Sequence, residues 1–289
     1  MDDFSFEIHT VSCERDKHLL INLISSLRSY NFFKNKKIII HECFEDKFKE
    51  DLILDNIKIF RHEEVESLIS KTLENYPNCN WIRQNYQTLV TNGACIKKLF
   101  DVYVTLQNQN LLYFDSDILI LNEPKEIINN IKNHINFYIK DIQDGYVQTS
   151  LDRNDFFKPL NIKGTNINGG LYYLKNINLK KYLDFVEDTL NYIYIKHYKH
   201  GKERDFLLKK AFSFFQIPWW TEQTILASFL LKNNAQPLNQ NKYFIPDDYD
   251  DYKSFNFNIV EAIHFAGKTR SKYQDTYLIN NFLKNNIYN

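Results

Sequence analysis

The sequence predicts an α/β protein whose mostly parallel sheet is flanked by helices. As far as about residue 175, short stretches rich in β-branched and aromatic residues alternate with longer stretches whose apolar residues recur at helical spacing. The 289 residues suffice for one large α/β unit or two small domains. Only 7 Gly and 6 Pro occur beside 23 Phe and 19 Tyr, which excludes disordered, collagen-like and linker-rich chains. We expect a single domain over residues 1–289 with a helical insertion at about 176–218.

The N-terminal part alternates strands and helices. Residues 4–11 (FSFEIHTV) mix aromatic, β-branched and polar residues as strands do, and residues 18–30 carry apolar residues at helical spacing. Residues 37–41 (KIIIH) are typical of a short buried strand, and 56–60 (NIKIF) indicate another. Residues 65–76 then predict a helix that ends at the following proline.

The pattern continues through the rest of the chain. Residues 93–107 predict a helix with an apolar stripe, followed by a strand over 111–114 (LLYF). A second apolar stretch, 118–121, comes after two aspartates, and Asn122-Glu123-Pro124 opens a helix with proline in its first turn. The remaining expected elements are strands 136–139 and 170–174 and helices 178–199, 206–215 and 221–231.

Charge and cysteine usage restrict the class of protein. The chain balances 36 Lys and Arg against 36 Asp and Glu, which argues against nucleic acid as a partner because that role needs a large basic excess. The start of the chain is acidic, and no window holds the apolar run of a membrane helix. The cysteines have irregular spacing and no CxxC pair, so we expect free thiols in a reducing cytoplasm. They are Cys13, Cys43, Cys79 and Cys95.

A pair of aspartates, Asp115-Ser116-Asp117, follows the predicted strand LLYF. Open α/β sheets bind ligands at the carboxyl ends of their strands, and alternation puts positions 115 and 117 on one side. Both carboxylates could therefore meet a hard divalent cation, which also binds water and phosphate oxygens. The alternative is an exposed turn between two strands. A second DxD triplet, 248–250, lies in a polar stretch and is expected to be a solvated loop.

Four segments, in this order, carry a resemblance to a known family. They are Lys97-Lys98-Leu99 leading into LLYFDSDILIL, Asn168-Gly169-Gly170-Leu171, Glu222-Gln223 at a helix start, and His264-Phe265-Ala266-Gly267-Lys268. With them, the chain over about residues 4–270 resembles the GT-A-fold (Rossmann-like) glycosyltransferases that use nucleotide sugars. The similar group includes glycogenin and the bacterial lipopolysaccharide galactosyl- and glucosyltransferases.

The resemblance implies a metal site made of Asp115, Asp117 and His264. It would hold Mn²⁺ or Mg²⁺, and a histidine among oxygen ligands favours Mn²⁺. The alternative for His264 is a core histidine on an edge strand. Lys268 could reach the diphosphate, but the family carries its basic residue six positions after the histidine, where this chain has Arg270. Both candidates remain open.

The resemblance also implies a catalytic and sugar-binding set of Asn168, Glu222 and Gln223. Gln223 would stand beside the anomeric carbon, and Asp141 would contact sugar hydroxyls. Gly169 and Gly170 would allow the sugar ring to approach the backbone, and the alternative is an ordinary tight turn before a strand. Glu222 could equally be an acidic residue that the dipole favours in the first turn of a helix.

The end of the first strand corresponds to the part of the family that underlies the nucleobase and ribose. Arg15 and His18 could contact the nucleotide, or could belong to a solvated helix start. The donor-binding residues implied in all are Thr10, Val11, Ser12, Arg15, Lys98, Asp115, Ser116, Asp117, Asp141, Gly169, Gly170, Gly267, Lys268 and Arg270.

The implied function is metal-dependent transfer of a hexose from a nucleotide sugar, such as a UDP-hexose, to a hydroxyl of a glycan or protein. The family retains the anomeric configuration, whereas an inverting enzyme could use Glu222 as its general base. The interval between Asn168 and Glu222 is longer than in the family, so the acceptor cannot be inferred from it. The basic run at 196–204 could meet an acidic acceptor or a membrane surface, although a solvated loop is favoured.

Two other functions compete with this one. A haloacid-dehalogenase-type phosphatase also carries DxD after an apolar strand, but near its first strand. A catalytically inactive nucleotide-sugar-binding protein of the same fold is the second. The retained acidic residues and His264 argue against the inactive protein.

Overall fold

The structure is a computed structural model that describes residues 5–43, 46–49, 55–86, 90–141, 166–198, 218–246, 256 and 258–266. The strands are β1 (Glu7–Ser12), β2 (Ile38–Glu42), β3 (Ile57–Phe60), β4 (Leu111–Phe114), β5 (Ile118–Ile120), β6 (Phe137–Lys140), β7 (Ile167–Leu174), β8 (Gln236–Pro237), β9 (Tyr243–Phe244) and β10 (Ala262–His264). The helices are the 3-10 helix η1 (Glu14–Asp16), α1 (Lys17–Arg28), α2 (His62–Leu73), α3 (Pro77–Tyr86), α4 (Val90–Leu99), α5 (Asp101–Val104), α6 (Lys125–Lys132), α8 (Leu179–Tyr198) and α10 (Pro218–Lys232). The expected helix 206–215 and the triplet 248–250 lie outside the described residues.

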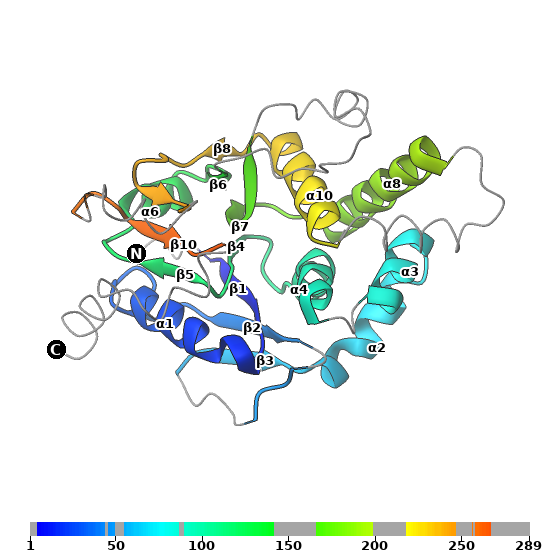
Figure 1. Cartoon of the computed structure of the whole chain (residues 1–289), viewed down its shortest axis with the longest axis horizontal. Coiled ribbons are helices and arrows are strands. Elements are labelled where there is room, and N and C mark those ends of the chain that lie inside the picture. Colours follow the sequence, from blue (N-terminus) through cyan, green and yellow to red (C-terminus); the bar gives the residue numbers. More distant parts are fainter. Residues whose placement is uncertain are drawn as a thin grey trace.

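A seven-stranded sheet in the order β3-β2-β1-β4-β7-β6-β8 forms the centre of the molecule (Figure 1). Strands β3, β2, β1 and β4 are parallel neighbours, and β8 is parallel to β6. Strand β7 is antiparallel to both β4 and β6. The predicted mostly parallel α/β sheet is therefore confirmed. A smaller sheet in the order β5-β10-β9 stands beside it.

The sheet separates two hydrophobic cores. Alternation along β4 sends Tyr113 into the core beneath α2, α4, α8 and α10, and Leu112 and Phe114 into the core beneath α1 and α6. Figure 1 shows the first group of helices on the right of the sheet and the second, with β5 and β10, on the left. Among the described residues, no helix combines the length and apolar character needed to cross a membrane.

One predicted helix is divided into two in the structure, and one observed helix was not predicted. The expected helix 93–107 is two helices, α4 and α5, interrupted at Phe100, whose φ is −118°. Helix α3 was not expected, because its sequence PNCNWIRQNY has little apolar periodicity. Its first turn receives help from a distant element: the Glu187 carboxylate on α8 accepts hydrogen bonds at 3.0 Å from the backbone N–H groups of Asn78 and Cys79. Pro77 begins this helix, whereas α2 has already ended at Leu73.

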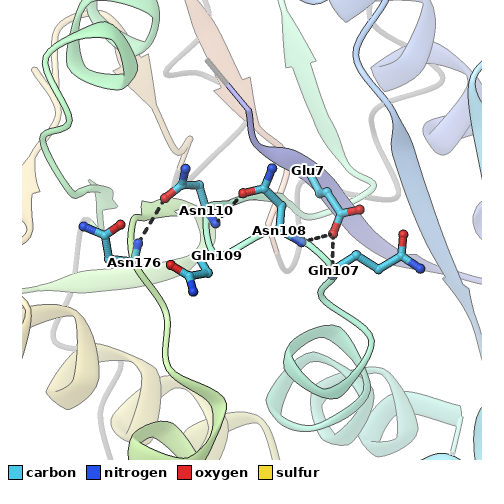
Figure 2. Close-up of a pocket in the computed structure, with 6 residues that line it drawn as sticks. All are labelled: Glu7, Gln107, Asn108, Gln109, Asn110 and Asn176. Atoms are coloured by element: carbon cyan, nitrogen blue, oxygen red, sulfur yellow. Dashed lines mark hydrogen bonds between the residues drawn. The ribbon is translucent and has the colours of Figure 1, made fainter. Parts of the chain in front are cut away.

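The amino end of the sheet carries a hollow of about 490 Å³, lined mainly by amide side chains. Figure 2 shows Glu7 at one end of this hollow and Asn176 at the other. The lining residues are Glu7, Gln107, Asn108, Gln109, Asn110 and Asn176. Hydrogen bonds from the backbone N–H groups of Gln107 (2.9 Å) and Asn108 (3.3 Å) both end on Glu7 Oε2. Glu7 therefore ties the start of β1 to the segment that leads into β4.

Glu7 should make the protein sensitive to acid. Burial alone would raise the pKa of Glu7, but hydrogen bonds with His9, Gln107 and Asn108 lower it from 4.5 to about 2. The stabilisation is complete above the unfolded-state pKa and is lost as the pH falls towards the folded-state pKa. Between about pH 6 and about pH 3, the free energy of unfolding of the wild type should fall by about 2 kcal/mol more than that of Glu7→Gln.

Urea denaturation at the two pH values measures this difference. Glu64→Gln, the same substitution at an exposed position of α2, serves as the control and should follow the wild type. Equal acid sensitivity of the wild type and Glu7→Gln would show that Glu7 does not carry the effect.

Candidate active site

Several elements end or begin at one edge of the sheet, beside the carboxyl end of β4. Strand β7 runs antiparallel to β4 and pairs Leu171 with Phe114, so the start of β7 meets the end of β4. Strand β6 also ends here, with Asp141 directly after it. Helix α4 packs against β1 and α10, and β10 reaches this edge through its antiparallel pairing with β5. The topology thus brings together residues as far apart in sequence as Lys98 and His264.

Asp115, Asp117 and His264 form a compact group. One potential ligand atom from each lies within 4.8 Å of the others, and among the described residues this is the group of His, Cys, Asp and Glu that could share a metal ion. His264 Nε2 lies 3.2 Å from Asp117 Oδ1 and 3.6 Å from Asp115 Oδ2. Burial would lower the pKa of His264, but the two carboxylates raise it. The site therefore favours positive charge between its carboxylates, and this donor set fits a Mn²⁺ or Mg²⁺ ion.

Lys98 connects this group to Glu222. Lys98 Nζ lies 3.1 Å from Asp115 Oδ1 and 3.2 Å from Glu222 Oε1. The side chain comes from α4, which packs against α10, so both residues project from helices onto the sheet edge. Burial raises the pKa of Glu222 to about 7, although the Lys98 ammonium opposes the shift. Asp115 and Glu222 together raise the pKa of Lys98 against the effect of its burial.

Asn168, Asp141 and Gln223 form a neighbouring amide and carboxylate cluster. Asp141 Oδ2 accepts hydrogen bonds from Asn168 Nδ2 at 3.1 Å and from Gln223 Nε2 at 3.2 Å. Gln223 Nε2 also donates to the Ile167 carbonyl at 3.0 Å. These bonds hold the amide nitrogen of Gln223 towards β7 and Asp141. The structure thus brings together three of the residues that the resemblance assigned to the sugar side.

Gly169 and Gly170 lie inside β7, whereas the sequence predicted a strand that begins only at Gly170. The pairing of β6 with β7 is irregular at this point: Tyr138 pairs with Tyr172, but the next residue of β6 pairs with Asn168. An irregularity of this kind changes the face to which side chains point. Accordingly, Ile167 and Leu171 belong to opposite cores although both are odd-numbered residues of one strand.

Each glycine makes room for a different part of the site. A Cβ atom on Gly169 would lie 2.9 Å from Glu222 Oε1 and 3.3 Å from Lys98 Nζ. A Cβ atom on Gly170 would lie 2.3 Å from His264 Cε1. Only glycine fits at position 170 without moving the imidazole. The pair therefore lets side chains of the protein pack against β7, rather than forming the tight turn that was the alternative.

The end of β1 is buried and carries two polar side chains. Among the described residues, the hydroxyls of Thr10 and Ser12 have no hydrogen-bond partner, and Val11 packs into the core beneath α4. Arg15 is exposed and lies 3.5 Å from Asp16 through Nε and Oδ1. His18 is also exposed. Gly267, Lys268 and Arg270 lie outside the described residues, so the choice between the two basic residues stays a prediction.

Sequence reasoning missed Tyr113. Its hydroxyl donates to Asp115 Oδ1 at 3.0 Å, and Lys98 Nζ lies 4.9 Å above its ring. Its spacing from Asp115 could have identified it, because residues two apart in an extended strand share a face. Ser116 is buried between the two aspartates.

Comparison with known proteins finds matches in structure but none in sequence. No known family model and no curated protein sequence matches the chain. The galactosyltransferase LgtC, solved with donor and acceptor sugar analogs, superposes with a TM-score of 0.54 at 13% identity, covering 96% of this chain and 94% of LgtC. The chain has the GT-A fold.

The bifunctional glycosyltransferase WbbM, solved without ligands, shows the same likeness. It superposes with a TM-score of 0.55 at 14% identity, covering 98% of this chain and 50% of WbbM. The predicted GT-A fold is therefore confirmed. In this GT-A fold, the Asp115 group stands at the carboxyl end of β4, where open α/β sheets bind their ligands.

Proposed function

We propose that the chain is a metal-dependent glycosyltransferase that transfers a hexose from a nucleotide sugar, with a UDP-hexose as donor, to a hydroxyl of a glycan or protein. The observation that carries the proposal is the group of Asp115, Asp117 and His264, joined through Lys98 to Glu222 at the carboxyl edge of a GT-A sheet. The fold favours this function over a phosphatase. The presence of Asp115, Asp117 and Glu222 together favours an enzyme over an inactive binding protein.

Asp115, Asp117 and His264 would hold Mn²⁺ or Mg²⁺. When bound, such an ion neutralises charge on the diphosphate leaving group. Lys98 keeps the Asp115 carboxylate in place through its 3.1 Å contact. His264 itself packs against Gly170, where the absence of a side chain leaves room for the imidazole.

On the sugar side, Asn168, Asp141 and Gln223 present amide and carboxylate groups that can bind and orient hydroxyls. Because Gln223 Nε2 is engaged with Asp141 and Ile167, its Oε1 is the atom left for the anomeric region. Glu222 is buried and anchored by Lys98, which suits a carboxylate that positions the donor sugar. We propose that the anomeric configuration is retained, as in the enzymes that the sequence resembles.

A panel of nucleotide sugars tests the function directly. Each donor is incubated with the full-length protein and Mn²⁺, with and without chelator, while release of the nucleoside diphosphate is followed. We expect release from a UDP-hexose, its loss on chelation, and binding of that donor in calorimetry. The anomeric configuration of the product, read by NMR, distinguishes retention from inversion.

Two results would refute the proposal. One is a failure of every nucleotide sugar to bind or to be cleaved by folded protein. The other is Mn²⁺- or Mg²⁺-dependent hydrolysis of a simple phosphomonoester through an aspartyl-phosphate, which would identify a phosphatase instead.

A further inference from the structure

Two cysteines follow the carboxyl ends of neighbouring strands in the central sheet. Cys13 comes after β1 and Cys43 after β2. The last paired residues of these parallel strands are Ser12 and Glu42, and the backbone N–H of Cys43 donates to the Ser12 carbonyl at 3.0 Å. Cys13 keeps an extended backbone with φ −141° and ψ 173°. The two cysteines are thus the next cross-strand pair, although 30 positions separate them in sequence.

The geometry of this pair suits a disulfide. Neighbouring strands lie about 4.8 Å apart, and disulfides join Cα atoms separated by about 4.4–6.8 Å. Both side chains belong to the core beneath α2 and α4, so they point to the same face of the sheet. Both cysteines are free thiols, and each thiol shifts the pKa of the other.

The surroundings give the two thiols different roles. Contact with the Cys13 thiol lowers the pKa of Cys43 against the effect of its burial, and the nearby charge of Lys97 assists. Contact with Cys43, together with burial, raises the pKa of Cys13. The Cys13 thiol also donates to Asp16 Oδ2 at 3.4 Å. Because the Cys13 thiol donates its proton to Asp16, we assign Cys43 as the first nucleophile and Cys13 as the thiol that reacts second.

We propose that Cys13 and Cys43 form a reversible disulfide when the protein meets a peroxide. The Cys43 thiolate attacks one oxygen of hydrogen peroxide, the O–O bond breaks, and a sulfenic acid and hydroxide form. The hydroxide takes up the proton that Cys43 has released and leaves as water. The Cys13 sulfur then attacks Cys43, an S–S bond forms, and the sulfenic hydroxyl leaves with the Cys13 proton as a second water. Two thiols are oxidised and one peroxide is reduced; an added dithiol then reduces the disulfide to two thiols and is itself oxidised.

This bridge would join the end of β1 to the end of β2, directly after the buried residues Ser12 and Glu42. It closes a loop that contains α1, so the oxidised protein should unfold at a higher urea concentration than the reduced protein. The pair shares no residue with the metal group or with Glu222. Its test is therefore independent of the proposed glycosyltransferase activity.

Mass spectrometry of the full-length protein tests the proposal. After treatment with a small excess of hydrogen peroxide, free thiols are alkylated and the protein is digested without reductant. We expect a linked pair of peptides that contain Cys13 and Cys43, lighter by two hydrogens than their sum and separated again by dithiothreitol. Cys79→Ser, the same change at another buried cysteine, should leave this link intact, whereas Cys43→Ser should abolish it.

Cys13→Ser gives a second, independent readout. Without the second thiol, a sulfenic acid should accumulate on Cys43 and be trapped by dimedone. The proposal is wrong if Cys13 and Cys43 are both alkylated after peroxide treatment of the wild type. It is also wrong if Cys43 instead links to Cys95, or if the 13–43 link forms only in denaturant.

Discussion

Replacing Asp117 with asparagine should lower Mn²⁺-dependent release of UDP from a UDP-hexose by about 10²–10³-fold, because a metal ion supplies several kcal/mol of charge stabilisation. The change keeps the size of the side chain but removes a buried negative charge 3.2 Å from His264 Nε2. Calorimetric titration with Mn²⁺ should show a parallel loss of affinity. The protein should remain folded, because the substitution also removes repulsion between two neighbouring carboxylates.

Asp184→Asn is the matched control. It makes the same substitution at a partly exposed aspartate of α8, which contacts Lys180 at 2.7 Å and the Tyr76 hydroxyl at 3.2 Å. This variant should bind Mn²⁺ and cleave donor as the wild type does. If Asp117→Asn retains both properties while folded, Asp117 does not hold a metal, and the proposed metal site is wrong.

Replacing Gly170 with alanine should also disrupt the proposed metal site, by displacing His264. The new Cβ would lie 2.3 Å from His264 Cε1, 2.7 Å from Nδ1 and 2.8 Å from Asn168 Oδ1, so the imidazole must leave its place beside the carboxylates. We expect the Mn²⁺ affinity to fall at least about tenfold, and overpacking should lower the free energy of unfolding by about 1–3 kcal/mol. Calorimetry measures the first effect and urea denaturation the second.

Gly169→Ala is the neighbouring control. Its Cβ would meet Glu222, Lys98 and Leu226 rather than His264, so Mn²⁺ affinity should stay near that of the wild type while transfer falls. A double-mutant cycle tests the mechanism: in a His264→Ala background, Gly170→Ala should cause almost no further loss of Mn²⁺ affinity. Additive losses, or equal Mn²⁺ affinities of the two alanine variants, would show that Gly170 does not act through His264.

Local pattern predicted much of the fold and part of the site. The strand over 111–114 agrees with β4 residue for residue, because a short apolar run bounded by polar residues specifies its own ends. The start of β7 was predicted at Gly170 instead of Ile167, since the irregular pairing of β6 with β7 is a property of two strands and not of one. Helix α3 escaped prediction for a similar reason: its first turn is completed by Glu187 from α8.

The sequence by itself determined the α/β class, the end of β4 and the kinds of chemical group available, because periodicity and residue type are local properties. Tertiary structure alone decided which groups meet. His264 reaches the aspartates because β10 pairs with β5, with His264 opposite Ile118. Cys13 and Cys43 become neighbours because β1 and β2 are parallel and in register. Contacts between distant segments depend on strand order and register, and these are set by packing of the whole sheet rather than by any one stretch of residues.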